Sequence, residues 1–358
     1  MAVSGERAPG RRVPGGWPGD RLPHGELVDA GGSRVHVVRD GSGRPPVLLS
    51  SGLGGTWLDW VPVVPLLAAR HEVVRFDRPG LGYSPPVPWA PSLRAEADRI
   101  AALVRALSPG EPGPSPAEPE ASSVQPEPST SEAGSRPPVI VAAHSMAAFH
   151  AEAFARLYPE LVGGLVLVDP SSEPEPDVLP ARVRIALSEL GSRAGRLTGR
   201  AAGLLGLTAA LAPPIRSFAT MQATVRRIDP VPPADARAAY GTGEAIGATL
   251  AELACYRWQA VDLARLRQER PFPAVPLVVL AATGRRRTPR ARQRSASRAR
   301  ELAQITPVGR DVEVANSGHL VSFDRPDAIA DAIESVTADM AGATGDAPGQ
   351  RGHGVNRG

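Results

Sequence analysis

Val139-Ile140-Val141-Ala142-Ala143-His144-Ser145-Met146-Ala147-Ala148 joins an apolar run to a helical pattern through a single serine. The apolar run predicts a strand buried on both faces, and the pattern from Ser145 to Leu157 predicts a helix directly after it. Such a corner is sharp, so the residues two before and two after the serine must be small, as Ala143 and Ala147 are. The Ser145 hydroxyl is then expected to project from the turn, with the helix N-terminus beneath it.

Further apolar runs on both sides of this corner predict a sheet. Helical patterns separate the later runs, and strands that alternate with helices imply right-handed crossovers and parallel pairing. The Gly31-Gly32 dipeptide predicts a hairpin between the first two strands. We therefore predict an α/β fold with a mostly parallel, eight-stranded sheet flanked by helices. The predicted strands are residues 26–30, 33–39, 46–51, 72–76, 138–143, 164–168, 276–281 and 311–315, and the helices outside the cap described next are 92–107, 145–157, 298–305 and 326–340.

Three polar segments, at the two ends of the chain and between the fourth and fifth strands, lack these patterns. The internal one is almost entirely Pro, Ser, Glu, Gly and Ala, which cannot bury enough apolar surface to offset the entropy of ordering. A block after the sixth strand has helical patterns but no clear strand, which predicts a helical cap. The predicted division is a disordered lead at 1–23, core at 24–169 with a disordered insertion at 108–136, the cap at 170–270, core again at 271–341, and a loose tail at 342–358.

The charge distribution argues against a nucleic-acid-binding protein. All 40 basic residues are arginine, the formal net charge is only +3, and most arginines are scattered among acids. One dense run has two open interpretations, the solvated face of a loop and helix or a contact for an anion or nucleic acid. Its members are Arg285, Arg286, Arg287, Arg290, Arg292, Arg294, Arg298 and Arg300.

The sequence shows no sign of secretion or membrane insertion. Residues 1–16 lack an apolar core of the signal-peptide kind, and no run reaches the roughly 18 apolar residues that span a bilayer. The apolar stretch Ala201–Pro214 is too short and predicts a core or lid helix. Cys255 is the only cysteine, which excludes an internal disulfide, and no clustered His or Cys spacing suggests a metal. We expect a cytoplasmic protein with no stable membrane insertion.

The corner at Ser145 resembles the nucleophile elbow of the α/β-hydrolase family, usually written G-x-S-x-G, with alanine here at both glycine positions. The segment Ser51–Gly55 resembles the family's oxyanion loop, with serine where the family usually has histidine. This resemblance implies that the backbone N–H groups of Leu53 and Met146 face the developing oxyanion.

The segment Phe76–Ser84 closely resembles the family's stretch after the fourth strand, where we give Asp77 a structural role in tying down the turn. The resemblance implies the α/β-hydrolase fold with a cap inserted after strand six. It covers roughly residues 24–107, 137–170 and 275–340.

Position singles out His319 among the seven histidines. It follows the last predicted strand, in a loop at the carboxyl edge of the sheet, where sites form in open α/β folds. The segment Ser317–His319 also resembles the loop that carries the family's catalytic histidine. We predict that His319 is the general base for Ser145, and that His144 points away from the nucleophile. The other histidines lie in loose ends, at early strands or on the helix after the elbow: His24, His36, His71, His150 and His353.

The acid that orients His319 is assigned from the resemblance. The family most often carries it after the seventh strand, but residues 282–289 contain no Asp or Glu. Some members carry it after the sixth strand, where Asp169 stands, and we assign Asp169 to this role. Two alternatives stay open: Glu173 supplies the carboxylate, or Asp169 caps a turn of the cap and the site works as a dyad.

The resemblance implies a serine hydrolase that cleaves a small carboxylic ester through an acyl-enzyme, without metal or cofactor, with related acyl compounds (amides, lactones and thioesters) as open alternatives. Its partner is then a small-molecule acyl substrate. Two other functions stay open: a cofactor-free lyase or peroxidase-like enzyme on the same fold, and a non-catalytic binding protein. Six aromatic residues are candidates to line an apolar substrate pocket, although each fits ordinary core equally well: Trp57, Trp60, Trp89, Phe218, Tyr256 and Trp258.

Overall fold

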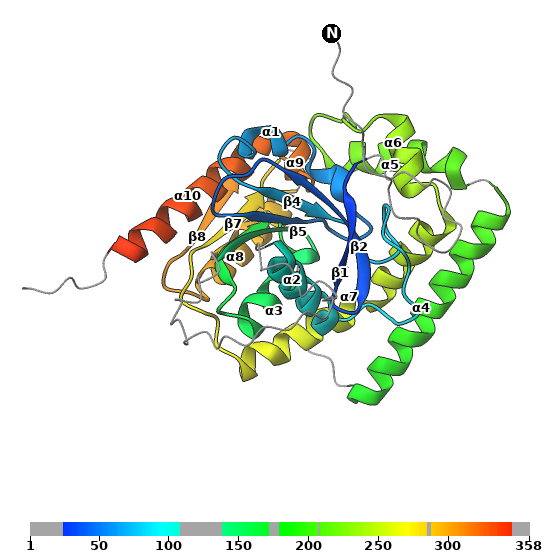
Figure 1. Ribbon diagram of the computed structural model, residues 1–358, viewed down its shortest axis with the longest axis horizontal. Helices are drawn as coiled ribbons and strands as arrows, with labels where there is room; N and C mark the ends of the chain where they lie inside the picture. Colours follow the sequence, from blue (N-terminus) through cyan, green and yellow to red (C-terminus); the bar gives the residue numbers. More distant parts are fainter. Residues whose placement is uncertain (1–23, 108–137, 172–178, 207, 285–287, 346–358) are drawn as a thin grey trace, which may run out of the picture.

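The computed structural model describes residues 24–107, 138–171, 179–206, 208–284 and 288–345 (Figure 1). The predicted lead at 1–23, the predicted insertion at 108–136, residues 346–358 of the predicted tail, Glu173 and residues 285–287 of the arginine run lie outside this description.

A single eight-stranded sheet runs through the protein in the order β1-β2-β4-β3-β5-β6-β7-β8. β2 pairs antiparallel with β1 and β4, and all the other neighbouring pairs are parallel. This confirms the predicted fold, an α/β-hydrolase type of sheet. The strands are β1 (Glu26–Ala30), β2 (Ser33–Asp40), β3 (Val47–Ser50), β4 (Val73–Phe76), β5 (Val139–His144), β6 (Val162–Val168), β7 (Leu277–Ala282) and β8 (Gly309–Val314).

The predicted β1–β2 hairpin is present. Gly31 and Gly32 have φ of +60° and +78°, and a two-residue turn of this kind requires positive φ at both central positions. Glycine adopts that backbone conformation without a steric penalty.

Helices cover both faces of the sheet, and the side chains of each strand alternate between them. In β3, Leu48 packs into the cluster beneath α2 and α3, whereas Val47 and Leu49 pack into the cluster beneath α1 and α10. The central strands are therefore buried on both sides, which explains their continuous apolar sequences. The helices of the core are α1 (Val64–Leu67), α2 (Leu93–Leu107), α3 (Ala147–Leu157), α8 (Pro289–Ala303), α9 (Val321–Asp324) and α10 (Pro326–Gly345), with a 3₁₀ helix η1 (Trp57–Trp60).

The short helices η1, α1 and α9 were not predicted, and of the predicted helices α8 and α10 depart most from their predicted bounds. α8 begins at Pro289, nine residues before the predicted start at Arg298, because proline at a first helical position gives up no hydrogen bond. α10 continues from the predicted end at Met340 to Gly345, so the first residues of the predicted loose tail are helical. Nothing in residues 341–345 breaks a helix strongly, since proline appears only at position 348.

In the described residues the connection between β6 and β7 is helical, as predicted; in Figure 1 its first three helices stand to the right of the sheet and its last helix returns beneath the core. The stretch Ala201–Pro214, predicted as one helix, instead spans a bend between two helices at Leu205 and Gly206, where Gly206 has φ of +69°. The cap helices are α4 (Ala181–Leu204), α5 (Thr208–Ala223), α6 (Pro233–Tyr240) and α7 (Gly243–Glu269). No helix in the described part of the chain is long and apolar enough to cross a membrane.

Glycine lets α4 and α7 approach backbone to backbone. A Cβ added at Gly199 would lie 2.2 Å from the Gly243 carbonyl oxygen and 2.5 Å from the Gly247 nitrogen. A Cβ at Gly195 would lie 2.9 Å from the Leu250 Cβ. These contacts lie beyond what close packing tolerates, so the cap depends on the absence of side chains along this seam.

We predict that Gly199→Ala lowers the free energy of unfolding by about 1–3 kcal/mol, because backbone atoms cannot yield to the new methyl group. Denaturant unfolding followed by circular dichroism measures this. Gly342→Ala in α10 is the matched control, because a Cβ there meets nothing within 4 Å. Alanine should be neutral or stabilise that helix by up to about 1 kcal/mol. Equal stability of the two variants would contradict the packing argument.

Candidate active site

Ser145 stands at a tight corner between β5 and α3. Its φ is +54°, a left-handed conformation that is strained for a residue other than glycine. The Ser145 N–H donates to the Val168 carbonyl oxygen at 3.0 Å, which fastens the corner to the neighbouring strand. Ala143 and Ala147 are fully buried beside it. The two small residues that the sequence analysis required, Ala143 and Ala147, are therefore the ones buried on either side of the turn.

The structure brings Ser145, His319 and Asp169 together. His319 Nε2 lies 2.9 Å from the Ser145 Oγ, and His319 Nδ1 lies 2.6 Å from Asp169 Oδ2. The three residues follow β5, β8 and β6, so they meet at the carboxyl edge of the sheet. Ser171 also places its Oγ 3.3 Å from the Ser145 Oγ.

The Asp169 carboxylate is buried, and each of its two oxygens has a hydrogen-bond partner. Its side chain is 4% exposed, and Oδ1 accepts hydrogen bonds from the Ala282 N–H at 3.0 Å and the Ser295 hydroxyl at 3.4 Å. The Asp169 N–H donates to the Leu280 carbonyl oxygen at 2.7 Å. With one oxygen fixed to β7, the other is aimed at the His319 ring. The alternative acid, Glu173, lies outside the described residues.

His144 contributes to the site in a way that the sequence interpretation missed. Its Nε2 donates to the backbone carbonyl oxygen of His319 at 2.9 Å, and the two rings lie 4.6 Å apart. Burial, and next the charge of a protonated His319, lower the pKa of His144 to about 3. A neutral His144 therefore anchors the loop that carries His319.

The loop after β3 lies directly against Ser145. A Cβ added at Gly52 would stand 3.0 Å from the Ser145 Cβ, so only glycine fits there without a shift. Leu53 lines the same cavity as Ser145, and Met146 is fully buried at the start of α3. Within the described residues, no hydrogen-bond acceptor is found for the N–H of Leu53 or Met146.

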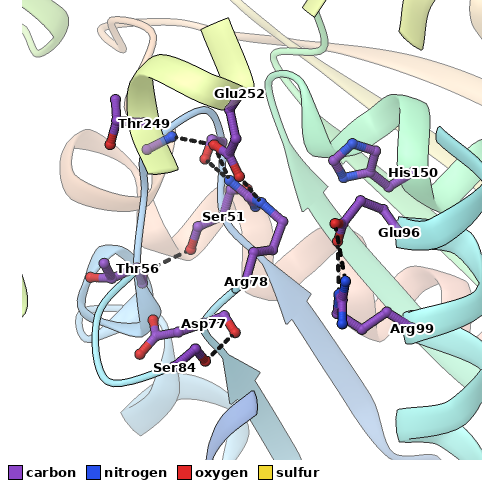
Figure 2. A network of polar contacts seen from close by, with 12 residues as sticks. Ser51, Thr56, Asp77, Arg78, Ser84, Glu96, Arg99, His150, Thr249 and Glu252 are labelled. Atoms are coloured by element: carbon purple, nitrogen blue, oxygen red, sulfur yellow. Dashed lines mark hydrogen bonds and ion pairs between the residues drawn. The ribbon is translucent and has the colours of Figure 1, made fainter. Parts of the chain in front are cut away.

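A buried ion pair between Arg78 and Glu252 contacts this loop, and the sequence analysis did not predict it (Figure 2). Arg78 binds both carboxylate oxygens of Glu252 on α7, and it also donates to the carbonyl oxygens of Ser51 and Gly52. Burial acts to lower the pKa of Arg78, but the charge and hydrogen bonds of Glu252 outweigh it, so the pKa is raised. No local pattern marks Glu252, because its partner lies 174 positions away.

Asp77 has the structural role expected from the sequence. Its Oδ1 accepts from the Trp57 N–H at 2.8 Å, and its Oδ2 accepts from the Tyr83 N–H at 3.1 Å. His36 Nδ1 lies 2.8 Å from the same Oδ2, and the Ser84 hydroxyl donates to the Asp77 carbonyl oxygen at 2.6 Å. The carboxylate thus closes the turn after β4 and keeps Arg78 in place.

An apolar cavity of about 590 Å³ opens above Ser145 and His319, between the loop after β3 and the cap. Its walls are mainly aliphatic, and the six aromatic candidates are absent from the described residues that line it. Trp57 and Trp60 are buried core residues, whereas Phe218 is exposed on α5. Lining residues from the cap include Leu205, Leu211, Ile215, Ile246 and Leu250.

A second cavity, of about 560 Å³, reaches Ser145 and His319 from the side of α8. Arg294 and Arg298, from the described part of the arginine run, line it together with Glu301. The described stretches contain no group of three or more His, Cys, Asp or Glu side chains arranged to hold a metal ion.

Comparison with known proteins identifies the family. A family model described as "Alpha/beta hydrolase family" matches residues 47–332. A segment of 90 residues is 41% identical to the "Probable oxidoreductase EphD" of Mycobacterium tuberculosis, covering 24% of this chain and 15% of that protein. Another of 75 residues is 36% identical to the "Putative carbamate hydrolase RutD" of Agrobacterium fabrum, covering 21% of this chain and 28% of that protein. The chain thus matches less than a third of the length of either curated relative.

Solved structures share the fold. The epoxide hydrolase CorEH aligns with a TM-score of 0.60 at 18% identity, covering 88% of this chain and 98% of that one. A thermophilic esterase from Thermogutta terrifontis aligns with a TM-score of 0.56 at 19% identity, covering 88% and 99%. Cfl2 from Burkholderia cenocepacia aligns with a TM-score of 0.59 at 19% identity, covering 86% and 94%.

The contact of His144 with the His319 loop predicts a specific pH dependence of stability. His144 titrates near 6.5 when unfolded but near 3 when folded, so below about pH 6.5 the unfolded chain binds the extra proton. As the pH is lowered from about 6.5 to about 3, the free energy of unfolding should therefore decrease, and His144 should account for about 1.4 kcal/mol of this decrease per pH unit.

Urea unfolding at pH 7, 6 and 5 tests this against His144→Gln, whose amide keeps a donor but does not titrate. The variant should show the shallower fall, while buried His150 contributes equally to both proteins. Equal slopes would mean that His144 is not buried as a neutral ring.

Proposed function

The chain belongs to the alpha/beta hydrolase family, and on that basis we propose that it is a serine hydrolase that cleaves a carboxylic ester through an acyl-enzyme. The observation that carries this proposal is the continuous contact from Ser145 through His319 to Asp169, at 2.9 and 2.6 Å. A hydroxyl, an imidazole and a buried carboxylate in that order form a general-base-activated nucleophile.

The proposed reaction has two stages. His319 Nε2 takes the Ser145 proton while Oγ forms a bond to the ester carbonyl carbon. The tetrahedral intermediate collapses, the bond to the alcohol oxygen breaks, and His319 returns the proton to the leaving alcohol. Water then attacks the acyl-enzyme with His319 again as base, which releases the acid and restores the Ser145 hydroxyl.

Asp169 is proposed as the acid of this site. Its carboxylate accepts the Nδ1–H of His319, which presents Nε2 to Ser145 in the form that can accept a proton. The second oxygen is occupied by the Ala282 N–H, so the carboxylate cannot turn away easily. This contact favours a triad over a Ser–His dyad.

The backbone N–H groups of Leu53 and Met146 are proposed as the oxyanion hole. Both peptides flank Ser145, one on the loop after β3 and one at the first turn of α3. The α3 N-terminus adds the partial positive charge of its aligned peptide dipoles, and Met146 at the N-cap makes no side-chain hydrogen bond to its first turn. Donors fixed in place before the reaction stabilise a developing oxyanion without reorganisation.

The aliphatic cavity is proposed to take an apolar group of the ester. Its charged groups pair with each other, since Arg216 donates to Asp59 at 3.0 Å and Tyr240 donates to the same carboxylate at 3.2 Å. The aliphatic side chains that make up most of the remaining surface favour hydrocarbon. The serine nucleophile favours acyl transfer over the alkyl-enzyme chemistry that an aspartate in its place would support.

We predict that the protein takes up one molecule of a fluorophosphonate probe, at Ser145. Ser145→Ala should abolish uptake, and Ser171→Ala, which removes the neighbouring hydroxyl, should still take up one molecule.

Asp169→Asn should slow ester turnover by about 10⁴-fold with the fold intact, because the imidazole is held in the wrong tautomer.

Intact-protein mass spectrometry, nitrophenyl acetate hydrolysis and circular dichroism make these measurements. A folded wild type that takes up no probe would favour the binding-protein alternative. Near-normal turnover in Asp169→Asn would remove Asp169 from the triad.

The cavity also predicts a preference for longer acyl chains. Among nitrophenyl esters, kcat/KM should rise about fourfold per added methylene until the cavity is filled, as burial of about 0.8 kcal/mol per methylene implies. Ile246→Trp, which places an indole in the cavity, should move the optimum to shorter chains. Leu253→Trp on the exposed side of the same helix is the control. An unchanged optimum in Ile246→Trp would show that the acyl chain lies elsewhere.

A further inference from the structure

Arg78 and Glu252 form an ion pair that is shut away from water between the core and the cap. Their side chains are 3% and 6% exposed, and Arg78 Nε lies 2.6 Å from Glu252 Oε1 while Nη2 lies 2.9 Å from Oε2. Removing two charges from water is expensive, and the attraction between them offsets this only when the geometry and further hydrogen bonds are good. The remaining hydrogen bonds of the pair all go to one loop.

That loop is the segment after β3 that carries Leu53. Arg78 donates through Nη1 to the Ser51 carbonyl oxygen and through Nη2 to the Gly52 carbonyl oxygen at 2.6 Å. Glu252 Oε2 accepts the Gly54 N–H at 2.8 Å. The ion pair therefore holds the peptide groups on both sides of Leu53. Figure 2 shows Arg78 and Glu252 beside Ser51 of this loop.

Peptide geometry turns these contacts into a direction for the Leu53 N–H. The Gly52 carbonyl and the Leu53 N–H belong to one planar trans peptide, so they point in opposite directions. Because the Gly52 oxygen faces Arg78, the Leu53 N–H faces away from Arg78. Gly52 itself lies against Ser145, where a Cβ would come within 3.0 Å of the Ser145 Cβ.

The loop adds one hydrogen bond of its own to this peptide, from the Gly55 N–H to the Gly52 carbonyl oxygen at 3.0 Å. Three of its residues, Gly52, Gly54 and Gly55, are glycine, and Gly54 has φ of +65°. Glycine has the widest choice of backbone conformations, so such a loop loses much entropy when a single one is selected. A Cβ at Gly54 would meet the Thr249 side chain of α7 at 2.8 Å, which shows how closely the cap covers the loop.

We propose that Arg78 and Glu252 are positioning residues that aim the Leu53 N–H at the oxyanion, and that this donor is in place only when the cap helix α7 is seated on the loop. Arg78 comes from the core after β4 and Glu252 from the cap, so the pair connects the place of the cap to the charge-stabilising site. This inference rests on the proposed serine-hydrolase function, whose oxyanion hole it concerns.

The test compares two carboxylate-to-amide changes on the same helix. Glu252→Gln removes the charge that holds Arg78, and Asp262→Asn removes a charge of α7 that pairs with Arg184 at 2.7 Å without touching the loop. Loss of one oxyanion donor lowers kcat by about 10²–10³-fold, so partial misalignment in Glu252→Gln should lower it by about 10–100-fold. KM for a nitrophenyl ester should change less than about threefold, because ground-state binding uses the apolar cavity.

Two readouts separate positioning from a merely structural role. The first is kcat per active site, counted by uptake of the fluorophosphonate probe, which is insensitive to an unfolded fraction. The second is the affinity for an alkyl trifluoromethyl ketone, whose adduct with Ser145 places an oxyanion in the hole. Glu252→Gln should lose about the same factor in both, whereas Asp262→Asn should keep both within about twofold.

Arg78→Lys serves if Glu252→Gln does not fold. It keeps the charge, but an ammonium group cannot bind two carbonyl oxygens and two carboxylate oxygens in the planar array of a guanidinium. It should show the same joint loss in kcat and ketone affinity. Suppose that the wild type hydrolyses esters but both variants keep kcat and ketone affinity within about twofold of it. This inference is then wrong while the proposed function stands. Where Glu252→Gln is unfolded, Arg78→Lys alone decides in the same way. A wild type with neither probe uptake nor hydrolysis would overturn the proposed function itself.

Discussion

The turn at Ser145 is the constraint on which the rest of the site depends. A serine with φ of +54° is strained by about 1–3 kcal/mol, and it persists only because its surroundings leave no other conformation. β5 on one side, α3 on the other and a hydrogen bond to Val168 hold it. The same turn lifts the hydroxyl out of the sheet and places it above the N-terminus of a helix.

The parallel sheet gathers the other groups around this turn. Asp169 follows β6 and His319 follows β8, and both reach Ser145 because parallel strands end at the same edge. Asp169 has φ of +40°, so a second strained corner aims the carboxylate. A hydrogen bond from His144 to the His319 carbonyl oxygen and one from the Ala282 N–H to the Asp169 carboxylate then hold the two residues beside Ser145, so little movement is left between the three side chains.

The cap contributes to the surroundings of Ser145 in two ways. It supplies the aliphatic walls above Ser145, and through Glu252 it also grips the loop that carries Leu53. The glycine seam between α4 and α7 makes that half of the cap rigid, because the two helices meet backbone to backbone. A rigid α7 can hold Glu252 at one position, which a loosely packed helix would not do.

Local sequence determined the corner at Ser145, the eight strands, the hairpin at Gly31-Gly32 and the positions of Asp169 and His319 at strand ends, because alternation, apolar runs and small turn residues are properties of neighbouring positions. Only the tertiary structure decided that Arg78 meets Glu252, that His144 anchors the His319 loop, and that the described walls of the cavity are mainly aliphatic, with none of the six aromatic candidates among them. These contacts join residues up to 175 positions apart. They depend on the order of strands in the sheet and on how α7 lies across the core, which no local pattern encodes.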